Sequence, residues 1–302
     1  MPDLYEFIAF VSEKSSVKNR SLVEKDLLIH KILNIIYSSE YFGENFVFKG
    51  GSCLVKCYFD YYRFSVDLDF TWKDQKVWKN LGKHELRRRL NEEIKRFGSF
   101  LEKIGKGADL DFKSDLKDRK YVEFGSGSRM VTLKMWKNLE LVKIQISFVD
   151  ETLFAPKTRV VKTLLDGVTT SKEDSVYFEE FLSYYKPFEV TAYDEREILC
   201  EKVRAILTRR AQKLRDFYDL FMLDKFGFKI EDFKEEILKK TQPALHFKRY
   251  RANLKRNRES LELMGALEDP FERELLVTRP PKEFDAFLKR ITKLLTTIMD
   301  SF

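Results

Sequence analysis

Cysteine and histidine are scarce in this sequence of 302 residues. The only members of these two residue types are Cys53, Cys57, Cys200, His30, His84 and His246. A small, odd number of cysteines without a regular spacing excludes a disulfide scaffold and predicts a reducing compartment. The histidines are too scattered along the sequence to complete a zinc site with these thiols.

Long apolar stretches are missing as well. No segment approaches the roughly 18 consecutive apolar residues that a membrane-spanning helix needs. The opening residues, MPDLYEFIAF, lack the basic start and the cleavage site of a secretion signal. We therefore expect a cytoplasmic protein with no membrane partner.

The composition is that of a folded protein with a sizeable core. The chain is 43% hydrophobic and has 27 Phe and 13 Tyr, which is too apolar and aromatic for a disordered chain. The 56 Lys and Arg residues exceed the 49 Asp and Glu residues, for a formal net charge of +7. This excess permits a polyanionic partner without requiring one, so a nucleic-acid interaction needs a local basic cluster as well.

The pattern of apolar residues changes character near residue 193. Before it, helices are expected over 4–13, 21–39, 53–59 and 84–104, and strands over 46–48, 66–72, 121–124, 130–135, 141–148, 159–164 and 188–192. After it, the pattern is almost wholly helical and is interrupted by prolines. We predict a first domain of residues 1–193 and a helical domain of residues 194–302.

A glycine pair stands between a predicted strand and a predicted helix, in the segment Lys49-Gly50-Gly51-Ser52. Glycine allows a tight turn and lets backbone N–H groups approach a phosphate closely. The start of a helix favours an anion at the same place, and the Ser52 hydroxyl adds a donor. Taken alone, a glycine pair of this kind is more often only a turn.

Asp67 and Asp69 alternate on the next predicted strand. Both carboxylates therefore point to one face, while Leu68, Phe70 and Trp72 point to the other. Two close carboxylates repel each other unless a cation lies between them, and Mg²⁺ prefers oxygen ligands that it shares with triphosphates. A solvated strand edge is the alternative, but the order strand, turn, helix, strand favours a phosphoryl-transfer site.

These two segments resemble a known family. The sequences FKGGSCL (48–54) and RFSVDLDF (63–70) are similar to the AbiEii/AbiGii-type nucleotidyltransferase toxins of abortive-infection or toxin–antitoxin systems. The family pattern is Gly-Gly-Thr/Ser followed by Arg-Phe-Ser-x-Asp-Ile/Leu-Asp. The resemblance implies an α+β fold, with a polymerase-β-like nucleotidyltransferase core of a mixed sheet with flanking helices, followed by a helical C-terminal region that contributes to the active-site cleft.

The helical region carries a second block of the resemblance, EKVRA (201–205) and RDFYDL (215–220). A capping box of Asp194 with Glu197 predicts the start of its first helix. Lys202 shares a stripe of that helix with apolar residues, so it points toward the core or a cleft and needs an anionic partner. A triphosphate and a nearby carboxylate are both possible partners.

The resemblance implies functional roles for three residues of this second block. Lys202 would contact the nucleotide phosphates, and Asp216 would be a further active-site carboxylate. Asp219 would belong to the nucleotide site or brace the helix. The alternative is a structural ion pair between Lys202 and Asp216, with Asp219 as a surface charge.

One position departs from the family pattern. Polymerase-β-type enzymes often carry a third carboxylate on a later strand, and Gln145 stands where family members tend to have Asp or Glu. Glutamine can coordinate a cation but brings no charge and cannot act as a base. The acceptor hydroxyl is then activated differently, for instance by Asp216, or turnover is slow or absent.

A basic cluster indicates the acceptor. Its six cations stand in eleven residues without an intervening acid and are interleaved with Phe247 and Tyr250; they are Lys248, Arg249, Arg251, Lys255, Arg256 and Arg258. Such a stretch is typical of RNA contact, with stacking on the aromatic rings. A second basic group within residues 87–96 is equally typical of a solvated helix face. By resemblance, the 3′ end of tRNA is the favoured acceptor.

These features predict a metal-dependent nucleotidyltransferase toxin that moves a nucleotide from a nucleoside triphosphate to RNA, with Mg²⁺ or Mn²⁺. The predicted catalytic residues are Asp67, Asp69, Lys202 and Asp216, with both strand aspartates as metal ligands. The predicted nucleotide-binding residues are Lys49, Gly50, Gly51, Ser52, Arg63 and Asp219, although Lys49 and Arg63 are equally explained as surface charges at strand ends. The alternatives are a protein-nucleotidylating enzyme and a non-catalytic nucleotide- or RNA-binding module. The resemblance also implies a cognate antitoxin encoded nearby.

Overall fold

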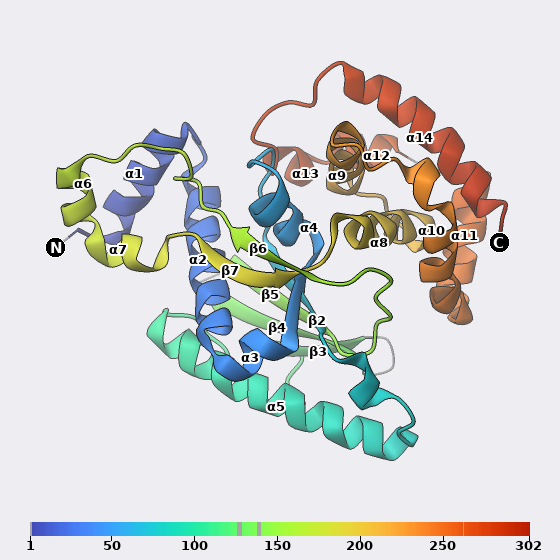
Figure 1. The fold of residues 1–302 in the computed structure, drawn as a ribbon, viewed down its shortest axis with the longest axis horizontal. Coiled ribbons are helices and arrows are strands. Elements are labelled where there is room, and N and C mark those ends of the chain that lie inside the picture. The colour runs from blue at the N-terminus through green and yellow to red at the C-terminus, as the bar shows by residue number, and fades with distance from the viewer. Residues whose placement is uncertain (1, 126–128, 138–139, 262) are drawn as a thin grey trace. The chain divides into compact units, whose positions relative to one another are not determined.

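The computed structural model describes residues 2–125, 129–137, 140–261 and 263–302 (Figure 1). The chain divides into two compact units. Unit 1 consists of Met1–Asp60, Phe64–Asp150 and Pro156–Ala192. Unit 2 consists of Tyr61–Arg63, Glu151–Ala155 and Tyr193–Phe302. Two short segments that interrupt unit 1 in the sequence therefore belong to unit 2.

Unit 1 is built on a seven-stranded sheet in the order β3-β4-β5-β2-β1-β7-β6. The strands are β1 (Phe46–Lys49), β2 (Asp67–Trp72), β3 (Val122–Gly125), β4 (Met130–Lys137), β5 (Glu140–Ser147), β6 (Lys157–Val161) and β7 (Phe188–Ala192). The pairs β2–β5 and β1–β7 are parallel, and the other pairs are antiparallel. The sheet is therefore mixed, and β2 lies between β1 and β5.

Helices of unit 1 precede, interrupt and follow the strands. They are α1 (Leu4–Ser15), α2 (Arg20–Ser38), α3 (Glu40–Asn45), α4 (Gly50–Cys53), the π-helix η1 (Leu54–Tyr58), the 3₁₀ helix η2 (Gln75–Trp78), α5 (Lys83–Gly107), α6 (Lys172–Tyr177) and α7 (Glu179–Tyr184). The short helices α6 and α7 were not predicted from the sequence, because neither is long enough to establish a helical repeat of buried residues.

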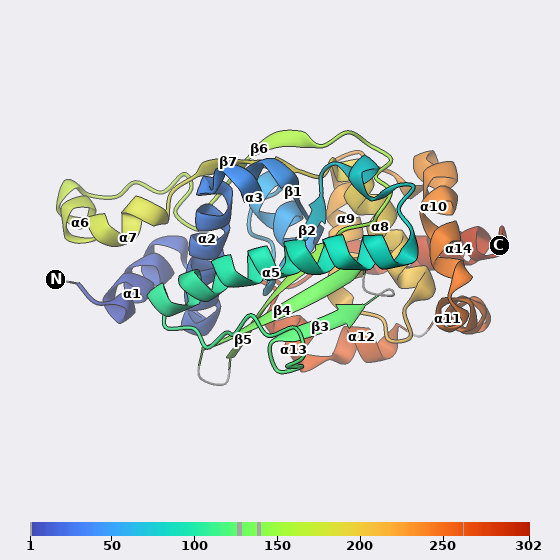
Figure 2. The ribbon, with the colours of Figure 1, turned by 90° about the horizontal axis from the view of Figure 1, so that it is seen from below.

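One face of the sheet is apolar and is covered by helices. Phe46 and Phe48 of β1 and Phe70 of β2 are completely buried. The ring of Phe46 lies 4.9 Å from that of Phe97 on α5, and α5 runs along this sheet in Figure 2. Because neighbouring residues of a strand alternate between faces, burial of this face leaves Asp67 and Asp69 on the opposite one.

A buried polar cluster links α2 to η1 and to the segment after α7. Lys56 of η1 lies 2.7 Å from the carboxylate of Asp26, which also accepts a hydrogen bond of 2.8 Å from the Tyr185 hydroxyl. Nearby, Nε2 of His30 is 2.9 Å from the carbonyl oxygen of Lys186, whereas its Nδ1 has no hydrogen-bond partner in the described part of the chain. His30 is therefore held as a neutral side chain, since burial and the charge of Lys56 lower its pKa from 6.5 to about 3.

Replacement of His30 with glutamine tests this neutral state, because glutamine can still donate to Lys186 but does not titrate. The pKa of His30 is lower in the folded state than in the unfolded state, so unfolding takes up a proton below about pH 6.5 and stability falls with pH. Between pH 7 and pH 5, wild-type unit 1 should lose about 2 kcal/mol through this residue. Urea unfolding followed by tryptophan fluorescence measures the loss, since Trp72, Trp78 and Trp136 all lie in unit 1. An equal pH dependence in the variant would contradict the assignment.

Unit 2 is mainly helical. Its elements are α8 (Glu195–Thr208), α9 (Leu214–Lys225), the 3₁₀ helix η4 (Ile230–Phe233), α10 (Lys234–Thr241), the 3₁₀ helix η5 (Gln242–His246), α11 (Lys248–Glu259), α12 (Met264–Glu268), α13 (Pro270–Glu274) and α14 (Glu283–Met299). Completely buried residues of its core include Val203 and Ile206 on α8 and Ile291 and Leu295 on α14.

The cap of α8 differs from the prediction. The side chain of Asp194 caps the helix by accepting from the backbone N–H of Arg196, but Glu197 does not complete a capping box. Glu197 is completely buried, where it accepts from the backbone N–H groups of Leu153 and Phe154 at 2.7 and 2.9 Å and lies 2.7 Å from Lys240. It thereby attaches the segment 151–155 to unit 2. A charge pattern at a helix start cannot reveal such a contact between distant parts of the sequence.

The predicted α+β fold, a mixed sheet with flanking helices followed by a helical C-terminal region, is confirmed. None of the helices in the described ranges combines the length and the apolarity that crossing a membrane requires.

Candidate active site

The glycine turn between β1 and α4 is shaped around a carboxylate. Gly50 has a φ of 75°, which side-chain-bearing residues rarely adopt. A Cβ atom added to it would lie 2.5 Å from Oδ2 of Asp69. Glycine is thus required here both by the backbone conformation and by the carboxylate that packs against it. The structure therefore brings Asp69 together with the glycine turn that was predicted to bind phosphate.

Asp67 and Asp69 lie on β2 as the alternation predicted. Both are partly exposed, whereas Leu68 and Phe70 are completely buried and Trp72 is 5% exposed. In the antiparallel pairing of β1 with β2, Lys49 stands opposite Asp69. The two carboxylates therefore share the polar face of the sheet with the end of β1.

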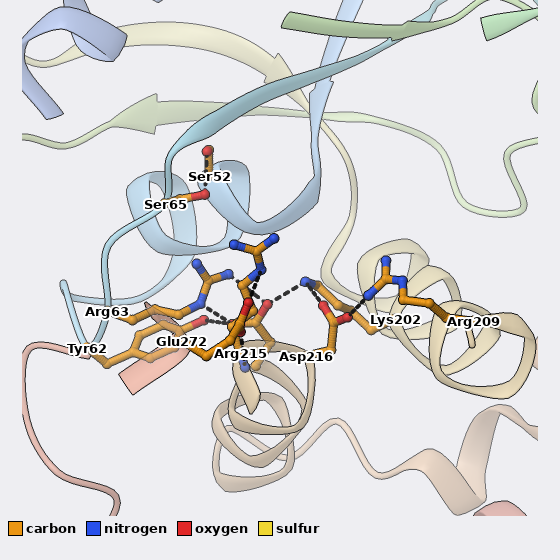
Figure 3. Close-up of polar contacts among 10 residues, drawn as sticks. Ser52, Tyr62, Arg63, Ser65, Lys202, Arg209, Arg215, Asp216 and Glu272 are labelled. Atoms are coloured by element: carbon orange, nitrogen blue, oxygen red, sulfur yellow. Dashed lines mark hydrogen bonds and ion pairs between the residues drawn. The ribbon is translucent and has the colours of Figure 1, made fainter. Parts of the chain in front are cut away.

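Ser52 uses its hydroxyl inside the protein. The side chain is 1% exposed, donates to the backbone carbonyl oxygen of Asp67, and lies 2.7 Å from the hydroxyl of Ser65 (Figure 3). These contacts tie α4 to the start of β2 and so hold the glycine turn against the strand that carries the aspartates. The hydroxyl serves to position this turn, and Ser65 is a partner that the sequence analysis missed.

Lys49 and Arg63 are not surface charges. Lys49 is 5% exposed, and its ammonium lies 3.2 Å from the carboxylate of Asp150. Arg63 is 1% exposed. The surface-charge alternative is therefore wrong for both residues.

Gln145 stands beside Asp69 on the neighbouring parallel strand. The register pairs Asp67 with Lys143 and Asp69 with Gln145, so all four side chains share one face. Gln145 is partly exposed and Lys143 is exposed. The structure therefore puts an amide and an ammonium next to the two aspartates. Both belong to β5, the strand on which a third carboxylate would be expected.

The donor set fits a hard divalent cation that completes its ligands from elsewhere. Within the described residues, no group of three or more His, Cys, Asp or Glu side chains could hold a metal ion. Two carboxylates on one face, with the Gln145 amide in register, match the oxygen preference of Mg²⁺, which usually takes one or two protein carboxylates together with waters and substrate phosphates.

Unit 2 contains the other predicted residues in one ionic cluster. Lys202 of α8 lies 2.7 Å from Oδ1 of Asp216 and 2.6 Å from Oδ2 of Asp219, both on α9 (Figure 3). Only 12% of the Lys202 side chain is exposed. The expectation that this lysine points inward and needs an anionic partner is confirmed, and the partners are two carboxylates three residues apart on one helix.

Asp219 is the shared counter-ion of Arg63 and Lys202. It accepts from Nε and Nη2 of Arg63 at 2.6 and 2.7 Å, and from the Tyr62 hydroxyl at 2.7 Å. Because Asp219 is completely buried, the surface-charge alternative is wrong for this residue. Tyr62 and Arg63 belong to the short segment 61–63 of unit 2, and Asp67 follows only four residues after Arg63 in the sequence. Asp219 therefore anchors the start of the stretch that leads to β2.

Asp216 is surrounded by positive charge. Arg209 contacts its Oδ2, and Lys202 its Oδ1. Burial alone would raise the pKa of Asp216, but the charges of Lys202 and Arg209 outweigh it and hold the pKa well below the ordinary value. The same balance, with Arg63 and Lys202 as the cations, lowers the pKa of Asp219. A carboxylate of such low basicity is poorly suited to take a proton from an acceptor hydroxyl.

The cluster includes one further acid that sequence reasoning missed. Glu272 of α13 accepts from the backbone N–H of Arg215 at 3.1 Å, and its other oxygen lies 3.6 Å from Nε of the same arginine (Figure 3). Glu272 is 57 residues from Arg215, so no local pattern marks the pair. It secures the first turn of α9, which carries Asp216.

The six cations predicted for RNA contact lie on α11 and are exposed. They form one helix, as the uninterrupted basic run predicted. Its other side is fixed to the end of α8: Asn253 donates to the carbonyl oxygen of Thr208 at 2.9 Å, and Asn257 donates to those of Leu207 and Arg209 at 3.0 and 2.9 Å. These amides satisfy carbonyl groups that the end of a helix leaves without partners.

Replacement of Gly50 with alanine should separate the backbone role of the turn from its contact with Asp69. The matched control is Gly167→Ala, because Gly167 has a φ of 74° and an added Cβ would meet nothing within 4 Å. We expect each variant to lose about 1–2 kcal/mol of stability from the left-handed backbone. Only Gly50→Ala should also lose activity, by about 100-fold, because the new methyl group displaces the carboxylate. Equal activity in the two variants, measured by nucleotide transfer and urea unfolding, would contradict the role of this contact.

A comparison with known protein families gives a match that spans the predicted site residues of both units. Residues 31–290 match the family described as "Nucleotidyl transferase AbiEii toxin, Type IV TA system", and this range contains the glycine turn, the two strand aspartates and the ionic cluster of unit 2. No curated protein matches the sequence. Since the match covers well over half of the chain, the chain belongs to the AbiEii family of nucleotidyl transferase toxins of type IV toxin–antitoxin systems.

Proposed function

We propose that this toxin transfers a nucleotide from a nucleoside triphosphate to a hydroxyl group of RNA, with the 3′ end of tRNA as the favoured acceptor, and that it requires Mg²⁺ or Mn²⁺. The observation that carries the proposal is the packing of the Asp69 carboxylate against Gly50, with Asp67 on the same face of β2. Family membership adds that the substrate is a nucleotide and implies a cognate antitoxin.

The reaction joins the acceptor oxygen to the α-phosphorus of the triphosphate. The bond from that phosphorus to the β-phosphate oxygen breaks, pyrophosphate leaves, and the acceptor hydroxyl loses its proton. There is little covalent chemistry for the protein, so catalysis consists mainly of positioning and of neutralising charge. A divalent cation held by Asp67 and Asp69 would supply positive charge to the triphosphate oxygens.

The glycine turn contributes backbone donors. Gly50 and Gly51 leave the main chain accessible at the start of α4, where N–H groups can bind phosphate oxygens without interference from side chains. The hydroxyl of Ser52 fixes the turn against Asp67, so its contribution to binding is the rigidity of the backbone. Lys49 is held by Asp150 and supports the same end of β1.

Lys202 is proposed to neutralise charge on the phosphates or on the departing pyrophosphate. It is held between two carboxylates and retains a small exposed area, so its ammonium is oriented before a substrate arrives. Asp216 is proposed to orient this lysine and to help place the nucleotide. Its low pKa argues against a role as the base that activates the acceptor hydroxyl. Gln145 cannot act as this base either.

The decisive assay supplies each of the four α-³²P-labelled nucleoside triphosphates with total RNA and total protein from a cell extract. We expect label to enter RNA of tRNA size, to be removed by ribonuclease, and to vanish in EDTA and return when excess Mg²⁺ or Mn²⁺ is added. Label that resists ribonuclease and is removed by protease would instead identify a protein acceptor. Transfer at full rate in EDTA would contradict the metal requirement.

A further inference from the structure

A cavity of about 540 Å³ lies along one side of α11, and neither the glycine turn nor the ionic cluster contributes to it. The residues that matter to its chemistry are His246, Arg251, Leu254, Lys255, Arg258 and Phe302. All of them belong to unit 2. A volume of this size suits a ligand of nucleotide dimensions, since small-molecule sites span about 300–1,000 Å³.

Helix geometry sorts the basic residues of α11 into two groups. Arg251, Lys255 and Arg258 are four and three residues apart, so they stand above one another on a single face, and all three line the cavity. Arg249 and Arg256 are seven residues apart and share a different face, outside the cavity. The basic run therefore is not one uniform stripe.

Two of the cavity cations are available to a ligand. Arg258 already donates to the carbonyl oxygen of Met299 and lies 3.5 Å from Asp300. Arg251 and Lys255 form no ion pair with any acid in the described part of the chain. Like charges four residues apart on a helix repel each other. An anion between them would relieve that repulsion.

The cavity also has an apolar side. Leu254 is 7% exposed and forms part of its wall, and Phe302 also lines it. Cations beside an apolar and aromatic surface are the combination that binds single-stranded nucleic acid, in which phosphates meet the cations and a base packs against the ring. A lone inorganic anion would make no use of the apolar wall.

We propose that this cavity holds one nucleotide of the acceptor RNA, with its backbone phosphates on Arg251 and Lys255 and its base against Phe302. The inference rests on the proposed RNA acceptor and identifies the part of unit 2 that binds it. The packing face of α11 is secured by Asn253 and Asn257, so substitutions at the cavity face leave the anchoring of the helix intact.

The test compares two double variants with the same loss of charge: Arg251→Ala with Lys255→Ala in the cavity, and, as the control, Lys289→Ala with Lys293→Ala, two exposed lysines that also lie four residues apart on one helix, α14. Fluorescence anisotropy measures binding of labelled tRNA at several salt concentrations, and transfer assays give KM and kcat for RNA and KM for the nucleotide. We expect the cavity pair to weaken RNA binding by about tenfold or more and to reduce the salt dependence by roughly two counterions. The control pair should change binding less than about threefold, and the nucleotide KM should stay the same in both.

A third variant, Phe302→Ala, examines the apolar side. It should weaken RNA binding without changing the salt dependence, because stacking releases no counterions. Equal weakening by the two double variants, or none by the cavity pair, would overturn the cavity assignment while leaving an RNA acceptor intact. Failure of the wild-type protein to bind or label any RNA would overturn both the acceptor and the cavity proposals.

Discussion

Replacing Asp69 with asparagine should reduce nucleotide transfer about a thousandfold, a loss of roughly 4 kcal/mol of transition-state stabilisation. Asparagine has the same shape, so the packing against Gly50 is retained while the negative charge is lost. A divalent cation shared with the triphosphate needs that charge, because an amide oxygen is a weaker ligand than a carboxylate. Transfer of α-³²P-labelled nucleotide to RNA at saturating triphosphate measures the effect.

The control for charge alone is Asp60→Asn. Asp60 belongs to unit 1, and its side chain is fully exposed. Its replacement should leave transfer within about twofold, as for surface substitutions that change stability by no more than about 0.5 kcal/mol. Unfolding of both variants in urea, followed by tryptophan fluorescence, verifies that unit 1 remains folded. Transfer by Asp69→Asn at more than a tenth of the wild-type rate would defeat the proposed site.

The double variant Asp67→Asn with Asp69→Asn tells whether the two carboxylates act together. If both bind one cation, removal of the second carboxylate should add little to the loss caused by the first, because residues that act as a unit are strongly non-additive. If the fold losses in transfer rate of the two single variants multiply in the double variant, the two carboxylates act independently. Raising the Mg²⁺ concentration should rescue either single variant in part, and replacement of Mg²⁺ with Mn²⁺ extends the comparison.

The second large effect is expected on stability. Replacing Asp219 with asparagine should destabilise unit 2 by about 3–5 kcal/mol, because it leaves the buried Arg63 without its counter-charge and removes one of the two carboxylates that hold Lys202. Hydrogen exchange in peptides that cover residues 195–225 measures the loss, since these peptides report on α8 and α9. Asp232→Asn, at an exposed position of η4, is the control and should exchange like the wild-type protein. A loss below about 1 kcal/mol would contradict the bracing role.

The same pair has a pH signature. The pKa of Asp219 is lower in the folded state than its ordinary value of 3.8, chiefly through Arg63 and then Lys202, which outweigh the opposing effect of burial. Its stabilising contribution is therefore present above that ordinary value and is lost as the pH falls below it. Acid should unfold wild-type unit 2 progressively below about pH 4, and Asp219→Asn should show a shallower dependence. If the stability of the variant depends on pH as steeply as that of the wild-type protein, the acid sensitivity arises from groups other than Asp219.

Local sequence patterns correctly predicted strand β2 and the shared face of its two aspartates. The alternation of Asp67 and Asp69 with apolar residues is a property of the extended chain itself, and it placed the carboxylates on the face opposite Leu68 and Phe70. The glycine turn followed from the backbone freedom of Gly50, and the inward direction of Lys202 from its helical stripe. Each of these features depends on residues within a few positions of one another.

Other features required the tertiary structure. Ser52 was expected to donate to a phosphate, but its hydroxyl binds Asp67 and Ser65. Glu197 was expected at a helix cap and instead holds the segment 151–155. In both cases the polar side chain could bind either the partner that the motif predicts or another group of the protein. The group that it binds is brought close by the fold, and local sequence patterns do not reveal it.

The sequence alone determined the strands and helices of the first part and the helical second part, the carboxylate pair on one face of a strand, the glycine turn and the basic run of residues 248–258. It could do so because the periodicity of strands and helices and the conformational freedom of glycine are local, whereas the class of fold followed from the family resemblance. Only the tertiary structure decided that Arg63 and Lys202 share Asp219, that Gln145 stands beside Asp69, and that three of the basic residues border a cavity. Local sequence patterns do not distinguish an aspartate in solvent from one that pairs with a buried arginine. The environment of Asp219 is decided when Arg63, 156 residues away in the sequence, packs against it.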